Sequence, residues 1–156
     1  MDIDLKNETY YLSGRMDEYS DFSPMLKAQP PLKLNIGKVS SINSVGVRKF
    51  LAFTLGWSPR KFEFYECTPE FIANVNVIPQ MLGNPSDETQ IKSFYVPFSC
   101  ESCKRVENVL FQREQITFDA QGEVVIPERK CTRCGEVLDL DVERTEYFMF
   151  LQVDAP

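Results

Sequence analysis

Four cysteines in the C-terminal third of this sequence constrain its fold more than any other feature. Cys100 and Cys103 form one Cys-x2-Cys pair, Cys131 and Cys134 form a second, and residues 104–130 lie between the pairs. Two such pairs are typical of zinc ribbons, because each pair lies on a tight turn and gives two thiolates to one tetrahedral ion. The sequence therefore predicts one structural Zn²⁺ held by these four cysteines.

Two other uses of the four cysteines stay open beside zinc. A pair of disulfides is disfavoured if the chain is cytoplasmic, because thiols stay reduced there. A mono-iron centre has the same ligands, but rubredoxin-like proteins usually place glycine or proline where this chain has Lys104 and Thr132. The fifth cysteine, Cys67, precedes a helix start that can lower its pKa, but at the end of an aromatic strand it is more simply a small core residue.

Composition and charge narrow the possible partners. The 156 residues contain 17 Lys and Arg against 23 Asp and Glu, a net charge of -6, which is opposite to the basic surface of a nucleic-acid binder. We therefore expect no direct contact with nucleic acid. No apolar run is long enough to span a bilayer, and residues 1–4 lack the basic region and apolar core of a signal peptide, so we expect no membrane contact and a cytoplasmic location.

Catalysis is not expected. The chain contains no histidine, which removes the usual imidazole base, and it has no glycine-rich phosphate loop. Four thiolates would also complete a zinc shell and leave no position for a reactive water. The composition therefore favours a binding protein over an enzyme.

Strand and helix patterns alternate along residues 1–92. Apolar alternation predicts strands at residues 10–14, 32–36, 62–65 and 91–95, the last joining the same sheet and leading into the first cysteine pair. Helical spacing predicts a short helix over residues 20–29, a helix from Asn43-Ser44 to about Gly56, and a helix opening at Thr68-Pro69-Glu70. A turn-rich connector is expected over residues 79–88. The fold class is therefore α/β, a mixed sheet packed with helices, followed by a small β zinc ribbon.

Three segments carry a resemblance to a known family. Residues 32–53, LKLNIGKVSSINSVGVRKFLAF, resemble the central strand, loop and helix of the STAS family (sulphate transporter and anti-sigma-factor antagonist domains). Residues 10–22 resemble the early strand, glycine turn and first helix of that family, and residues 69–82 resemble its third helix. The resemblance implies a STAS-like domain over residues 1–92, with residues 93–156 as an appended zinc ribbon.

The resemblance also implies a bacterial partner switch. In bacterial regulators of this family, an anti-sigma-factor kinase phosphorylates the hydroxyl at the position of Ser44, and the unphosphorylated protein binds that kinase. Asn43 and Gly46 flank this position, and a helix start favours an anion while a glycine leaves room for a kinase or phosphate. The competing interpretation is that Asn43 and Ser44 only cap the helix.

Four further residues on the same helix are candidates for a partner surface. Phe53 and Trp57 lie at one edge of the apolar face, where packing in the core is the competing interpretation. Arg48 and Lys49 can face a phosphate or a partner carboxylate, or simply lie in solvent. The favoured function is a signalling module that binds protein partners, and the alternative is a zinc-ribbon adaptor that docks into a transcription or other nucleic-acid complex.

Overall fold

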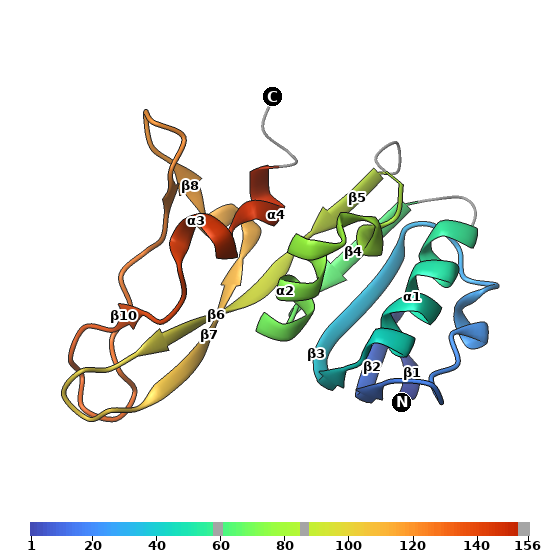
Figure 1. Ribbon diagram of the computed structural model, residues 1–156, viewed down its shortest axis with the longest axis horizontal. Coiled ribbons are helices and arrows are strands. Elements are labelled where there is room, and N and C mark those ends of the chain that lie inside the picture. The colour runs from blue at the N-terminus through green and yellow to red at the C-terminus, as the bar shows by residue number, and fades with distance from the viewer. Residues whose placement is uncertain (58–60, 85–87, 153–156) are drawn as a thin grey trace.

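The computed structural model describes residues 1–57, 61–84 and 88–152 (Figure 1). In chain order the elements, with η for a 3-10 helix, are β1 (Asp2–Lys6), β2 (Thr9–Met16), η1 (Ser23–Met25), β3 (Leu32–Ile42), α1 (Ser44–Gly56), β4 (Lys61–Tyr65), α2 (Pro69–Val77), η2 (Pro79–Leu82), β5 (Glu88–Ile91), β6 (Ser93–Ser99), β7 (Val106–Gln112), η3 (Arg113–Gln115), β8 (Thr117–Phe118), β9 (Val124–Val125), β10 (Asp139–Leu140), α3 (Arg144–Tyr147) and α4 (Met149–Gln152). Within these ranges, no helix has the length and apolar content that a membrane span requires. Residues 85–87 of the expected connector lie outside the described ranges.

A five-stranded sheet forms the N-terminal part, in the order β1-β2-β3-β4-β5. β1 is antiparallel to β2, and the other neighbours are parallel. Parallel neighbours need a crossover connection, and α1 and α2 supply two of these, between β3 and β4 and between β4 and β5. Both helices pack on the same face of the sheet, because Phe50 of α1 and Phe71 of α2 both contact Phe64 of β4. The expected mixed α/β class is confirmed.

The two main helices begin where their sequence signals lie. Thr68 precedes α2 and its hydroxyl accepts a hydrogen bond from the Phe71 amide at 3.2 Å, while Pro69 occupies the first turn. α1 ends at Gly56 as expected. The strand before α1 is longer than the expected strand at residues 32–36. The apolar stretches on both sides of Gly37 form one continuous strand of 11 residues, β3.

The helix expected over residues 20–29 is wrong. Only the single 3-10 turn η1 forms there. The Asp21 carboxylate accepts hydrogen bonds from both the amide and the hydroxyl of Ser23, and this local turn competes with a longer helix. Phe22 and Met25 are buried while Leu26 is exposed, so two side chains anchor the segment without a helical face.

The strand expected over residues 91–95 forms as two strands that belong to different sheets. β5 ends at Ile91 and closes the five-stranded sheet, whereas β6 begins at Ser93 and pairs with β7 and β10. Phe94 bridges to Cys67, which keeps the two sheets joined. The chain therefore changes sheet at residues 92 and 93, and β6 then leads directly to Cys100, as expected.

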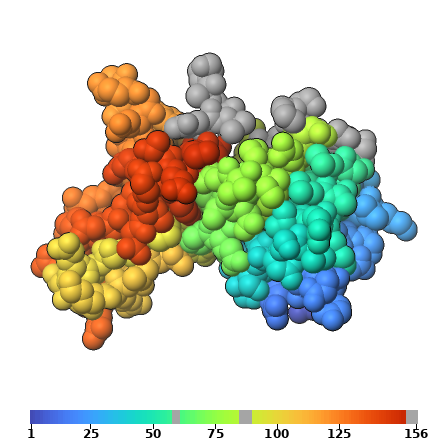
Figure 2. Space-filling view, viewed as in Figure 1, coloured from blue at the N-terminus to red at the C-terminus, as the bar shows by residue number. Residues whose placement is uncertain are grey.

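The C-terminal helices α3 and α4 attach residues 93–152 to the N-terminal part of the chain. The Asn76 side chain of α2 donates hydrogen bonds to the carbonyls of Glu146 and Tyr147 at 3.0 and 2.9 Å. α4 also contacts α2, and its Phe150 packs on Phe94 of β6, the residue that bridges to Cys67, with ring centres 5.0 Å apart. Figure 2 shows the C-terminal residues, in red, lying against α2, in green. One continuous apolar core therefore extends through both parts.

Candidate functional site

The four paired cysteines converge on one point between two turns. Their sulfur atoms all lie within 4.8 Å of one another; Cys100 and Cys134 are 3.4 Å apart, and Cys103 and Cys131 are 3.6 Å apart. A tetrahedral ion with Zn–S bonds near 2.3 Å would separate its sulfurs by about 3.8 Å. All five cysteines of the chain are free thiols, so the disulfide alternative is wrong. The arrangement can hold one metal ion.

The two cysteine turns have the same backbone geometry. The amide of Lys104 donates to the carbonyl of Cys100 at 2.8 Å, and the amide of Gly135 donates to the carbonyl of Cys131 at 2.9 Å. Lys104 and Gly135 both adopt left-handed backbone conformations, with φ of 59° and 79°. Glycine favours this conformation and lysine tolerates it at some cost. The lysine therefore takes the backbone role that a glycine has in the second turn.

Backbone amides and neighbouring thiols shape the electrostatics of the sulfur cluster. The backbone amide of Cys103 lowers the pKa of Cys100 to about 7, and the Cys134 thiol adds to this effect. The amide of Glu136 lowers the pKa of Cys134, but the Cys100 thiol, burial and the other thiols outweigh it and raise that pKa to about 12. Crowded thiols oppose one another's ionisation, whereas a bound cation favours the thiolates that ligate it. The donor set fits a soft divalent metal ion.

Glu107 is a residue of this site that the sequence did not indicate. Its carboxylate accepts hydrogen bonds from the amide and hydroxyl of Thr132 at 3.1 and 2.9 Å, and it lies 3.5 Å from the Cys131 sulfur. Arg105 pairs with the same oxygen at 3.6 Å. Glu107 thus fixes the second cysteine turn to β7. The β6–β7 register places it there, and an isolated acid in a strand carries no local signal for this role.

Asn43 and Ser44, at the start of α1, have different roles. The Asn43 side-chain oxygen accepts hydrogen bonds from the amides of Val45 and Gly46 at 3.0 and 2.8 Å, so Asn43 alone caps the helix. Ser44 is the first helical residue and is exposed, and its hydroxyl has no partner among the described residues. The interpretation that Ser44 also caps the helix is therefore wrong.

Acidic and basic side chains surround this helix start. Glu18, which follows β2, accepts a hydrogen bond from the Asn43 side chain at 3.0 Å. The backbone amide of Glu18 and the Asn43 side chain both lower the pKa of its carboxyl group. Lys49 donates to the carbonyls of Glu18 and Ser20, so it holds the loop after β2, while Arg48 is exposed. The sequence did not indicate Glu18, because the fold of β2 and β3 brings it there.

Gly46 is buried against the end of β2. A Cβ atom at this position would lie 2.1 Å from the carbonyl oxygen of Met16 and 2.8 Å from the amide nitrogen of Asp17. The missing side chain therefore makes room for the protein's own backbone. The expectation that Gly46 leaves room for a kinase or phosphate is wrong.

The aromatic candidates for a partner surface lie in the core. Phe53 packs against Phe22 with ring centres 5.6 Å apart, and Trp57 packs against Phe62 at 5.2 Å. Both side chains are almost completely buried, so neither is available to a partner. Cys67 is also fully buried, and burial raises the pKa of its thiol, which fits a core residue.

The division of roles at the start of α1 gives a stability prediction. Asn43→Ala should lower the free energy of unfolding by about 1 kcal/mol, because it removes the acceptor for two helix amides. Ser44→Ala should change it by less than about 0.5 kcal/mol, since an exposed hydroxyl without a partner is lost. Urea denaturation of the two variants checks this. A larger loss in Ser44→Ala than in Asn43→Ala would contradict the assignment of the cap.

Comparison with protein-family models, with curated proteins and with solved structures gives no match for this chain. Its own residues and their geometry therefore carry the functional inference.

Proposed function

We propose that this chain is a protein-interaction module of the STAS partner-switching type, with a structural zinc ribbon attached. The observation that carries the proposal is the exposed Ser44 hydroxyl at the first residue of α1, with the helix cap supplied by Asn43. A kinase can reach such a hydroxyl, and its modification would not remove the cap. In this proposal the partner is a protein, an anti-sigma-factor-like kinase, in the cytoplasm of a bacterium.

A phosphate on Ser44 would change the charge of this surface without refolding it. It would add about -1.5 to -2 charges at pH 7. The carboxylate of Glu18 lies beside Asn43 and the Lys49 ammonium group lies on the carbonyl of Glu18, so the phosphate would shift a mixed surface toward negative charge. A partner that docks on the unmodified surface would then lose affinity through charge repulsion and desolvation.

In this proposal the metal is zinc and its role is structural. Four cysteines can complete a tetrahedral shell, and the backbone turns around them form without further ligands. Three two-residue strands (β8, β9 and β10), the 3-10 turn η3 and two four-residue helices build little core of their own around β6 and β7. Metal binding would therefore supply folding free energy to this part, as in other small metal-bound modules.

The phosphorylation proposal predicts opposite behaviour of two variants. Ser44→Asp should reduce retention of the partner, because it adds a charge at the docking surface, whereas Ser44→Ala should retain the partner as the wild type does. Affinity purification of the three proteins from the native cell, with identification of the retained proteins by mass spectrometry, measures this.

The matched control is Gln121→Asp, which adds the same charge at an exposed position in the C-terminal part. It should leave retention unchanged. Equal retention by wild type and Ser44→Asp, with no phosphate on Ser44 in protein from its own cell, would contradict the switch.

A further inference from the structure

β1 is an open edge of the five-stranded sheet. It is the first strand in the sheet order and pairs only with β2, and Figure 1 shows it at the end of the sheet away from β6 and β7. Its register with β2 is continuous from Asp2 to Lys6, without the bulge or proline that protects many edge strands. Within the described ranges, no backbone group bonds to its outer side. Such an edge can accept another strand.

The turn after β1 determines which of its backbone groups face the open side. Asn7 and Glu8 connect β1 to β2 and both have positive φ, 48° and 63°, as in a two-residue type I′ turn. The residues that flank such a turn form a hydrogen-bonded pair, and bonded pairs alternate with non-bonded pairs along the ladder. Every second residue of β1, counted back from Lys6, therefore bonds to β2. The N–H and C=O groups of Ile3 and Leu5 face outward.

The side chains of β1 divide between the two faces of the sheet. Ile3 lies opposite the buried Leu12, so Ile3 and Leu5 are on the face that carries the core. Leu5 is nevertheless 59% exposed, because β1 is the last strand on this side. The opposite face carries the three exposed, charged side chains of the strand: Asp2, Asp4 and Lys6. The edge thus presents an apolar row and a charged row, one on each face.

We propose that this edge binds β1 of a second copy of the chain, antiparallel to the first, with a two-fold axis at Asp4. In this register Ile3 of one copy lies opposite Leu5 of the other, and their outward backbone groups exchange two hydrogen bonds. The two-fold axis repeats this pair on its other side, as in any isologous interface. The two five-stranded sheets become one continuous sheet, and the exposed Leu5 packs against Ile3 of the second copy.

Charge complementarity selects this register. Asp2 lies opposite Lys6 of the second copy, and the axis creates the same ion pair again on its other side. Neither side chain has an ion-pair partner among the described residues of its own chain. A register moved by one residue turns the apolar row toward the wrong face. A register moved by two residues, with the axis at Leu5, pairs Asp4 with Lys6 but keeps only one bonded backbone pair.

Two repulsions limit the affinity of this dimer. Asp4 lies opposite its own copy across the axis, where like charges destabilise a strand pair. Each chain also has a net charge of -6. The contact is one short strand, so its area falls below the roughly 1,200 Å² of stable complexes. The dissociation constant is therefore on the order of 10–1,000 μM.

Sedimentation equilibrium of the zinc-loaded full chain, from about 10 μM to about 1 mM, tests the proposal. Asp2→Lys should weaken the dimer at least about fivefold, because it places a like charge opposite Lys6 twice, although it lowers the net charge that separates the chains. Asp2→Lys combined with Lys6→Asp should restore the wild-type affinity, since it exchanges the two charges and leaves the net charge at -6. Glu114→Lys, the same charge change at an exposed position in η3, should not weaken the dimer.

Asp4→Asn locates the axis. It should strengthen the dimer at least about twofold, because it removes the repulsion across the axis. The register with its axis at Leu5 predicts the opposite, a loss of affinity, because Asp4 there pairs with Lys6. Circular dichroism shows whether each variant keeps the wild-type fold.

Three results would overturn the proposal. The first is a wild-type chain that stays monomeric at about 1 mM. The second is an Asp2→Lys variant with wild-type affinity, or no recovery when Lys6→Asp is added. The third is weaker association of Asp4→Asn, which would assign the other register. The inference does not depend on the proposed function, so failure here leaves the Ser44 test standing, and failure at Ser44 leaves this one.

Discussion

Removing the metal should unfold the C-terminal part of the chain. Cys131→Ser, or chelation of the wild type, takes one ligand or the ion away from a cluster whose sulfurs lie within 4.8 Å of one another. Structural zinc contributes about 10–16 kcal/mol of apparent binding free energy in zinc-finger peptides, which is as much as the whole stability of an ordinary domain. We expect one zinc per chain by elemental analysis, and loss of protease resistance over β6, β7 and β10 when it is removed.

Cys67→Ala is the matched control for this experiment. Cys67 is a buried thiol outside the cluster, so its loss should leave a small cavity and cost about 1 kcal/mol without changing the zinc content. Purified protein with no metal, or with iron in place of zinc, would contradict the zinc assignment. A proteolysis pattern that stays the same after chelation would contradict the structural role of the metal.

The effect of metal removal should extend into the five-stranded sheet. Asn76 of α2 donates to two carbonyls of α3, and α2 also contacts α4 and β6. Unfolding the C-terminal part would remove these contacts and leave the α2 side chain without its acceptors. Hydrogen exchange should therefore accelerate in α2 after chelation, and more there than in α1, which is farther along the sheet from the junction.

Local chemistry in the sequence was enough to predict the helix starts and the cysteine turns. The cap at Thr68 and the two Cys-x2-Cys spacings each depend on residues within a few positions of one another, so the pattern itself contains the geometry. The α/β class followed from the order of these local patterns. Where a local pattern was weak, as over residues 20–29, Asp21 and Ser23 formed a competing turn and the expected helix did not form.

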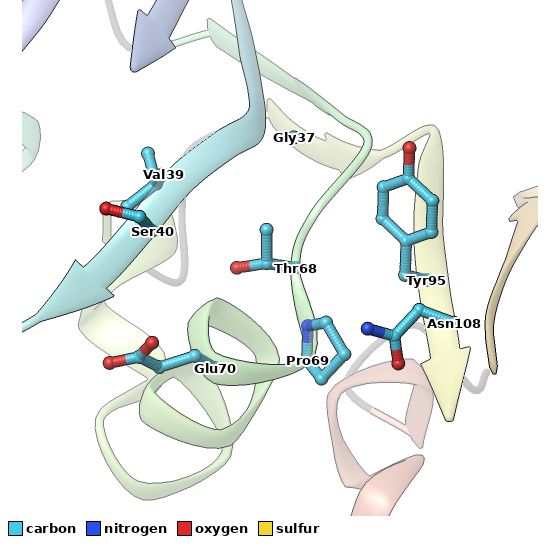
Figure 3. Close-up of a pocket in the computed structure, with 8 residues that line it drawn as sticks. All are labelled: Gly37, Val39, Ser40, Thr68, Pro69, Glu70, Tyr95 and Asn108. Carbon is cyan, nitrogen blue, oxygen red and sulfur yellow. The ribbon is translucent and has the colours of Figure 1, made fainter. Parts of the chain in front are cut away.

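Features that depend on distant contacts could not be predicted in this way. Glu107 reaches Thr132 only because β6 and β7 pair in one particular register. Glu18 reaches Asn43 only because β2 and β3 are parallel neighbours. Sequence position gives no measure of either distance. An open pocket of about 420 Å³ is a similar case, since residues of β3, the start of α2, β6 and β7 line it (Figure 3).

Gly46→Ala should be among the most destabilising single substitutions in the first helix. The new Cβ atom would lie 2.1 Å from the Met16 oxygen. Cβ atoms in proteins almost never come closer than 3.0 Å to another heavy atom. The obstacle is backbone at the end of a paired strand, so α1 or β2 must shift as a whole. Overpacking of this kind costs about 3 kcal/mol or more, and should lower Tm by roughly 6–12 °C in a chain of this length.

Gly56→Ala in the same helix is the control, because nothing lies within 4 Å of a Cβ atom there. Alanine should be neutral or should stabilise the protein by up to about 1 kcal/mol, through its higher helix propensity. Urea and thermal denaturation of both variants measure the difference. If Gly46→Ala folds with wild-type stability and loses only its partner, Gly46 serves the partner surface and the close packing of α1 on β2 is contradicted. If it loses stability as expected, its place beside Ser44 reflects the packing of the helix start and not recognition.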